Sequence, residues 1–323
     1  MATANWPATL QEAIRYFTDP DVCLAAAIKL RWSNGPIACP TCGCTNVHFI
    51  ASRRIWRCRE EHTQRQFSVK VGTIMEDSPI GLDKWLTAIW LLSSAKNGIS
   101  SCELARSIGV TQKTAWFLLH RIRLAMQRGS FTKMGGQVEA DETYIGGKAR
   151  FMHKGKRERV ITGTGGMGKV AVMGLLQRHG PEGHSTVRAN VVKGIGKALL
   201  QAAVRANVTK DASVFTDALK SYDGLSTDYV HQVIDHAERY VDGQIHTNGL
   251  ENFWSLLKRA IKGTYVSVEP FHLFRYLDEQ TFRFNTRKMT DAQRFVQLGR
   301  TIVGKRLTFD SLTGHDLPES HPY

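Results

Sequence analysis

The spacing of apolar residues predicts a small α/β module at the start of the chain. Apolar side chains recur at a period near 3.6 over residues 11–32, which is typical of a helix. Short runs of strand-forming residues follow at 47–50, 54–57 and 66–69. We therefore predict that residues 1–75 form a first domain, in which an N-terminal helix precedes small hairpins.

The pattern becomes purely helical over residues 76–130. Apolar positions predict three helices, at 81–95, 102–108 and 111–128. A short turn at Gly109 joins the second of these helices to the third, which is the layout of a helix-turn-helix. An ordinary three-helix bundle with a basic face would have the same pattern.

The third of these helices would carry the DNA-contacting side chains. A recognition helix contacts base edges with its N-terminal residues, which here are Gln112, Lys113 and Thr114. Further along the helix, polar or basic surface is expected from His120, Arg121 and Arg123. Of these, Arg121 is the expected DNA contact.

Strands and helices alternate from residue 135 onwards. The first strand is predicted within residues 138–147, which end in a Gly-Gly turn. Further strands are predicted at 169–176, 186–192, 213–217 and 230–234, with helices at 196–206 and 246–259. This order is that of the ribonuclease-H-like fold, a mixed sheet with helices on its faces. We therefore expect a multidomain α/β protein, with this fold at 135–290 and a C-terminal tail at 291–323.

Three acidic residues lie where that fold brings side chains together. Asp141 follows the apolar part of the first strand, Asp217 ends the fourth, and Glu251 lies in the last helix. Phosphodiester transfer requires an activated attacking oxygen and a stabilised leaving oxyanion, and two magnesium ions about 3.5–4 Å apart can provide both. Because Mg²⁺ prefers carboxylate oxygens, we predict that these three acids bind magnesium.

Two basic residues follow Glu251 on the last helix. Lys258 lies two helical turns after Glu251 and therefore shares its face, where it could contact a DNA phosphate. Arg259 is a further candidate DNA contact. The alternative is that Lys258 and Arg259 belong to a solvated face.

Other residues near the acids have structural interpretations. Asp217 could cap a helix beginning at residue 218, which is a frequent role of aspartate. Glu142 faces away from Asp141, because neighbouring strand residues point to opposite faces, and we expect it to be peripheral. Trp254 shares a helix face with apolar residues, so we expect it in the core.

Four metal-binding side chains lie in the hairpins of the first domain. They are Cys39, Cys42, Cys58 and His62. The first pair has Cys-x2-Cys spacing and the second Cys-x3-His. Two ligand pairs on hairpins are the layout of a zinc ribbon, in which a closed tetrahedral Zn²⁺ supplies folding energy. The alternatives to His62 as the fourth ligand are Cys44 and His48.

Composition and charge point to a polyanionic partner. The 323 residues have a formal net charge of +14, and a strongly basic protein is expected to meet nucleic acid. A basic surface kept for solubility is the alternative. The six cysteines fit metal binding in a reducing compartment better than a secreted disulfide framework. With neither an apolar run of roughly 20 residues nor a signal-peptide pattern, we expect a cytoplasmic protein without a membrane partner.

Four motifs together resemble a known family. They lie at residues 39–42, 67–74, 138–147 and 248–259, the last followed by 263–265. The chain resembles the insertion-sequence transposases that combine an N-terminal zinc ribbon with an ISXO-like DDE domain. The resemblance covers nearly the whole chain, and its last two motifs are long and specific.

The resemblance implies a two-metal-ion polynucleotidyl transferase that uses Mg²⁺ or Mn²⁺. Such a protein binds terminal inverted repeats and joins cut or copied strands to target DNA, as a homo-oligomer on DNA in the bacterial cytoplasm and nucleoid. The resemblance places catalytic roles on Asp141, Asp217 and Lys258. The third metal ligand would be Glu251 or Asn248. We favour Glu251, which carries a charge, since Asn248 is also a good helix cap.

Two other functions fit the same sequence. One is a sequence-specific DNA-binding regulator whose third domain has lost catalysis. The other is a nuclease or resolvase of the same fold that hydrolyses strands without joining them. Metal-dependent cleavage distinguishes a transposase from the first, and a strand-transfer product distinguishes it from the second.

Overall fold

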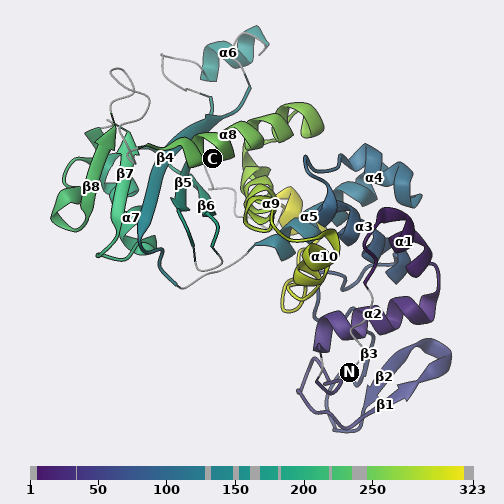
Figure 1. Cartoon of the computed structure of the whole chain (residues 1–323). Coiled ribbons are helices and arrows are strands. Elements are labelled where there is room, and N and C mark those ends of the chain that lie inside the picture. The colour runs from purple at the N-terminus through teal and green to yellow at the C-terminus, as the bar shows by residue number, and fades with distance from the viewer. Residues whose placement is uncertain are drawn as a thin grey trace. The chain divides into compact units, whose positions relative to one another are not determined.

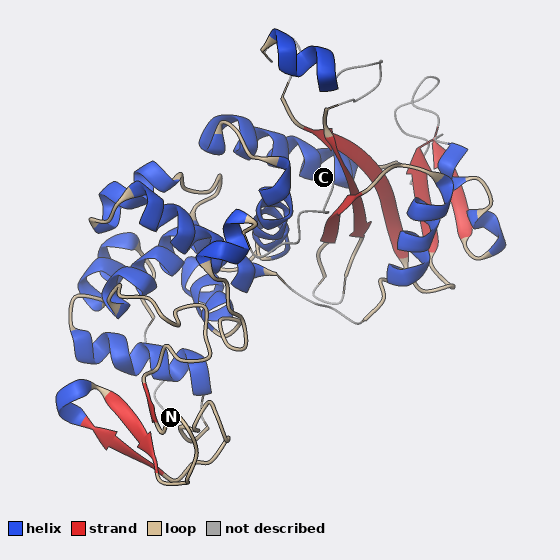
Figure 2. Cartoon of the chain, turned by 180° about the vertical axis from the view of Figure 1, so that it is seen from behind, coloured by secondary structure: helices blue, strands red, loops and turns tan. Residues whose placement is uncertain are grey.

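The computed structural model divides the chain into two compact units (Figures 1 and 2). The first unit contains residues 1–127 and 288–322, and the second contains residues 128–287. The structure describes residues 6–33, 35–127, 132–147, 153–160, 168–180, 183–217, 220–234 and 246–315. Within these segments, every helix is too short or too polar to span a lipid bilayer.

Two helices replace the single N-terminal helix that the apolar pattern predicted. They are α1 (Leu10–Tyr16) and α2 (Pro20–Trp32). Pro20 lacks a backbone N–H and disfavours helical geometry in the residue before it, so it begins α2 instead of continuing α1. The Asp19 side chain caps α2 by accepting from the backbone N–H groups of Asp21 and Val22.

The hairpins of the first unit form a small antiparallel sheet in the order β1-β2-β3. Its strands are β1 (Val47–Ile50), β2 (Ile55–Cys58) and β3 (Gln66–Phe67). Trp56 and Phe67 are both buried and stack with their ring centroids 5.9 Å apart. Both residues belong to a buried apolar cluster that the sheet shares with Leu24 and Ala27 of α2.

Three helices follow in the order that the apolar pattern predicted. They are α3 (Leu82–Ser94), α4 (Ser101–Ile108) and α5 (Gln112–Met126). Ser100 and Thr111 cap α4 and α5, and Gly109 ends α4 in the left-handed region, with φ of 63°. The short turn from α4 to α5 is therefore determined by these local signals.

Residues 291–315 of the expected C-terminal tail are packed into the first unit. They contain α10 (Asp291–Gly299) and α11 (Phe309–Thr313), which pack against α3 and α5 respectively. Phe295 of α10 is fully buried, with its ring centroid 5.5 Å from that of Phe17. A β-carbon at Gly299 would lie 2.6 Å from a methyl carbon of Leu30, so only glycine permits this approach of α10 to α2.

The second unit is built on a five-stranded mixed sheet in the order β6-β5-β4-β7-β8. The strands are β4 (Gln137–Ile145), β5 (Val170–Gln177), β6 (Thr186–Val192), β7 (Ser213–Asp217) and β8 (Val230–Ile234). The first three pair antiparallel, whereas β7 and β8 are parallel to β4. The predicted α/β class is confirmed.

Helices cover both faces of this sheet (Figure 1). On one face, α7 (Lys197–Asn207) packs Leu200 and Val204 against the sheet. On the other, α8 (Asn248–Ala260) and α9 (Leu273–Asn285) bury Leu250 and Leu277. Among the described residues, the remaining helical segments are α6 (Lys154–Val160) and the short turns Ala51–Arg53, Lys220–Tyr222, Leu225–Thr227, Ile261–Tyr265 and Pro270–His272.

Candidate functional site

Strand pairing brings Asp141 and Asp217 to the same face of the sheet. In the parallel pair β4–β7, Glu139 lies opposite Phe215, and the two aspartates follow two residues later on their respective strands. Residues two apart on a strand share a face. Asp141 Oδ2 accepts a hydrogen bond of 2.8 Å from Trp254 Nε1 of α8, so this is the face that α8 covers.

Close packing of α8 on the sheet depends on a glycine. Gly174 of β5 lies opposite Asp141 in the antiparallel ladder. A β-carbon at Gly174 would lie 2.6 Å from the Trp254 ring, so no other residue leaves room for it. Trp254 is buried, as its apolar helix face predicted, but its hydrogen bond to Asp141 was not predicted. A lone glycine inside a strand was the available signal of close approach.

The pKa of Asp141 reflects its burial and the charges that surround it. Burial raises the pKa of Asp141 to about 6, while hydrogen bonds from Trp254 and from the backbone N–H of Glu142 lower it. The negative charges of Asp217 and Glu251 raise the pKa further. These three carboxylates are therefore close enough to repel one another, and a bound cation would relieve that repulsion.

The helix α8 separates its buried and exposed residues by face. Leu250, Phe253, Trp254 and Leu257 are buried, whereas Asn248, Glu251 and Lys258 are exposed. Asn248 is the first residue of α8, after the N-cap residue Thr247, so it does not cap the helix. The capping role suggested for Asp217 concerns a segment starting at residue 218, which lies outside the described residues.

Glu142 lies closer to the acids than the sequence suggested. It is half-buried on the opposite face of β4 and accepts a hydrogen bond from the hydroxyl of Tyr222. Burial raises the pKa of Glu142 to about 7, the Tyr222 hydrogen bond lowers it, and the charges of Asp141 and Asp217 raise it. Glu142 therefore contributes to the electrostatics of this site.

The four predicted zinc ligands come together in the first unit. The ligand atoms of Cys39, Cys42, Cys58 and His62 all lie within 4.8 Å of one another. Cys39 Sγ is 3.5 Å from His62 Nε2, and Cys42 Sγ is 3.6 Å from Cys58 Sγ. Tetrahedral zinc with sulfur and nitrogen ligands has ligand atoms roughly 3.5–3.8 Å apart, so this donor set fits the ion.

The surroundings of this group support His62 as its fourth member. His62 Nδ1 donates to the carbonyl of Thr63 at 2.6 Å, which leaves Nε2 free to bind a metal. The two alternatives, Cys44 and His48, are not members of the group. Cys44 Sγ lies 3.7 Å from a carboxylate oxygen of Glu60 instead.

The residues expected to read DNA lie at the N-terminal end of α5. Gln112 and Lys113 are exposed and Thr114 is half-buried. The Gln112 amide donates to Ser101 Oγ of α4 at 2.8 Å, and Lys113 Nζ lies 4.5 Å from the ring centroid of Phe309. All three residues therefore remain at least partly exposed, although each has a side-chain partner within the unit.

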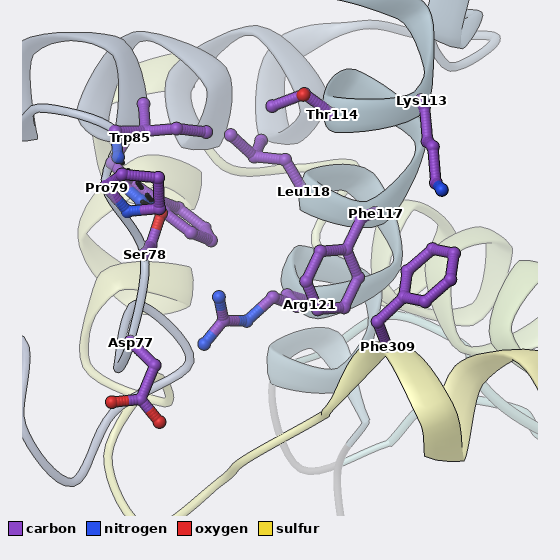
Figure 3. A pocket seen from close by; sticks show the side chains of 11 residues that line it. Asp77, Ser78, Pro79, Trp85, Lys113, Thr114, Phe117, Leu118, Arg121 and Phe309 are labelled. Carbon is purple, nitrogen blue, oxygen red and sulfur yellow. Dashed lines mark hydrogen bonds between the residues drawn. The ribbon is translucent and has the colours of Figure 1, made fainter. Parts of the chain in front are cut away.

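Arg121 is not on an exposed helix face. It is 4% exposed, donates to the carbonyl of Glu76, and lies beside the rings of Trp85 and Phe117 at the edge of a cavity of about 230 Å³ (Figure 3). His120 and Arg123 are buried as well. The prediction of a basic surface here was wrong, because α3, α4 and α11 all pack against α5.

Comparison with known proteins identifies the class. Residues 133–285 match the ISXO2-like transposase domain, and residues 19–64 match the transposase zinc-ribbon domain. One relative, described as an uncharacterized protein in transposable element ISH50 of Halobacterium salinarum, is 28% identical over 72% of this chain and 79% of its own length. The protein is therefore of the transposase class.

A second relative supports the same conclusion. An uncharacterized transposase-like protein of Haemophilus influenzae is 32% identical over 29% of this chain and 77% of its own length. The chain belongs to the insertion-sequence transposase family whose members carry a zinc ribbon and an ISXO2-like domain.

Proposed function

We propose that this protein binds the terminal inverted repeats of its insertion sequence and catalyses metal-dependent DNA strand cleavage and transfer. The observation that carries the proposal is that Asp141 and Asp217 lie on the same face of the paired strands β4 and β7. The helix that carries Glu251, α8, is bonded to Asp141 through Trp254, and the chain belongs to a transposase family. The mixed sheet with helices on both faces supports a ribonuclease-H-like fold for this unit.

Asp141, Asp217 and Glu251 would hold two Mg²⁺ or Mn²⁺ ions. Oxygen donors suit these hard cations, which would activate the attacking oxygen and stabilise the leaving oxyanion. Trp254 orients the Asp141 carboxylate through its N–H group. Asn248, one turn before Glu251, is the alternative third ligand, and Lys258 would contact a DNA phosphate.

DNA recognition is proposed for the first unit. The α4-turn-α5 pair would act as a helix-turn-helix, with Gln112 reading a base and Lys113 and Thr114 contacting the backbone or bases. Arg259 of α8 would add a phosphate contact. The zinc ribbon would be structural and would belong to the proposed domain 1–75, whereas the helix-turn-helix would form the proposed domain 76–130. The protein would act as a homo-oligomer on DNA in the bacterial cytoplasm.

The proposal is tested by incubating the full chain with the DNA ends that flank its own gene, with and without Mg²⁺. We expect end cleavage and joined products only with metal, and none from Asp141→Asn at equal DNA binding. Cleavage without joining would indicate a nuclease. Specific binding without cleavage under any metal would indicate a regulator, a function that the family match does not favour.

A further inference from the structure

A buried ion pair lies beside the acids, two residues before Asp141 on the same face of β4. Glu139 is 1% exposed and accepts a 2.7 Å hydrogen bond from Arg178 Nε through Oε1. Its second oxygen, Oε2, accepts a 2.9 Å hydrogen bond from the backbone N–H of Leu250, in the first turn of α8. One carboxylate thus joins strand β4 to both Arg178 and the start of α8.

Arg178 extends this connection to two further segments. Its guanidinium donates to the backbone carbonyl of His246, just before α8, and lies 4.4 Å from the ring centroid of Phe215 on β7. Gly249 allows the close approach, because a β-carbon there would lie 2.8 Å from Glu139 Oε2. The pair therefore links β4, β7 and the N-terminal end of α8 at one point.

Each of these contacts involves a residue that lies within two positions of a proposed catalytic residue. Glu139 precedes Asp141 by two residues on the same face of β4, and Phe215 precedes Asp217 likewise on β7. Leu250 directly precedes Glu251, and His246 lies two residues before Asn248. A shift of α8 relative to Glu139 would therefore move the helix-borne metal ligand away from the strand-borne ones.

We propose that the Glu139–Arg178 pair is a positioning device that sets where Glu251 lies relative to the two strand aspartates. This inference rests on the proposed metal-dependent cleavage. Burying an ion pair is costly and often gains no stability over apolar packing. The position of this pair is therefore better explained by the geometry that it imposes than by a gain in stability. Catalysis is sensitive to such geometry, since a misplacement of about 1 Å can cost on the order of 100-fold in rate.

The second unit contains a matched control. Glu279 and Arg283 of α9 form another buried ion pair, with side-chain exposures of 1% and 8%, the same as for Glu139 and Arg178. Glu279 accepts hydrogen bonds from Arg283 and from Tyr265, and neither of these residues lies within two positions of a proposed catalytic residue. Its loss should lower stability without displacing the acids.

The experiment compares Glu139→Gln with Glu279→Gln in the full chain. Cleavage of the end DNA is measured against Mg²⁺ and Mn²⁺ concentration, beside DNA affinity and thermal melting. We expect Glu139→Gln to cleave roughly 10- to 100-fold more slowly and to need more metal for half-maximal rate, with DNA affinity unchanged. Glu279→Gln should have a lower melting temperature but keep the wild-type metal requirement.

Two outcomes would overturn the inference while leaving the proposed function intact. The first outcome is that the wild type cleaves and that Glu139→Gln and Glu279→Gln have the same metal requirement. If Glu139→Gln does not fold, Arg178→Lys is read in the same assay, because it keeps the charge but loses the fork to His246. The second outcome is that neither Glu139→Gln nor Arg178→Lys folds, which would make the Glu139–Arg178 pair a requirement for folding. A folded wild-type chain without cleavage would instead refute the proposed function.

Discussion

The indole N–H of Trp254 donates a 2.8 Å hydrogen bond to Asp141 Oδ2 and joins α8 to the central strand β4. This bond favours the ionised carboxylate and opposes the effect of burial, which raises the pKa of Asp141. A residue of the apolar core therefore also orients a proposed metal ligand.

Replacing this donor should move the pH dependence of cleavage. Trp254→Phe keeps an aromatic ring but has no N–H, so the pKa of Asp141 should rise above about 6 and the acidic limb of the pH–rate profile should shift to higher pH. The rate should fall roughly tenfold or more. Phe253→Leu, a change at the neighbouring buried ring, is the control that should leave the profile in place. Superimposable profiles for Trp254→Phe and wild type would contradict this role.

Removing the charge at Asp141 should stabilise the metal-free fold while abolishing cleavage. The pKa of Asp141 is raised to about 6, so ionisation opposes folding above that pH, and the effect disappears as the pH falls toward that of an unfolded aspartate, about 3.9. We expect Asp141→Asn to gain about 1–3 kcal/mol at pH 7.5 without added Mg²⁺, and less at pH 4.5. Denaturant titration of both proteins at each of these two pH values measures the difference in free energy of unfolding. Equal stability of the two proteins at pH 7.5 would contradict a raised pKa of Asp141.

The third metal ligand can be assigned by two substitutions. Glu251→Gln should abolish Mg²⁺-dependent cleavage because the amide loses the charge that holds the ion, whereas folded Asn248→Ala should retain part of it. Both are assayed with a thermal-melting control. Cleavage that survives in Glu251→Gln but not in Asn248→Ala would reverse the assignment, and loss in both would mean that the two residues share the site.

Zinc should be required for folding of the first unit's small sheet. Cys39→Ser and Cys58→Ser should each lose the ion and the strand structure around it, since metal binding and folding are coupled there. Cys44→Ser is the matched control, because Cys44 lies outside the ligand group. Metal analysis should give one zinc per wild-type chain. A folded first unit without zinc in Cys58→Ser would disprove the site.

Two basic residues of α5 should differ in their effect on DNA binding. Lys113→Ala should weaken binding across sequences and reduce the salt slope by about 1, as expected on loss of one phosphate contact. Arg121→Met should instead destabilise the fold, because Arg121 is buried and bonded to Glu76. Gln112→Ala should reduce discrimination at one base pair. A reduced salt slope in a stable Arg121→Met protein would restore Arg121 as a DNA contact.

Much of the local structure could be predicted from residue order alone. Capping by Thr111 and the left-handed turn at Gly109 determine where α5 begins, because these signals act over a few neighbouring residues. That Cys39, Cys42, Cys58 and His62 meet was predictable for a similar reason, since short spacings on hairpins limit which side chains can meet. The same holds for the acids, which a recognisable order of strands and helices assigned to one site.

The features that could not be predicted from the sequence depend on contacts between distant segments, which only the tertiary structure determines. Arg121 has the sequence character of a surface residue, yet α3, α4 and α11 surround its helix and bury it. The links from Trp254 to Asp141 and from Glu139 to Arg178 and Leu250 join residues 39 to 113 positions apart. Periodicity reports which face of an element is apolar, but not which partner covers that face, and it is the partner that determines these contacts.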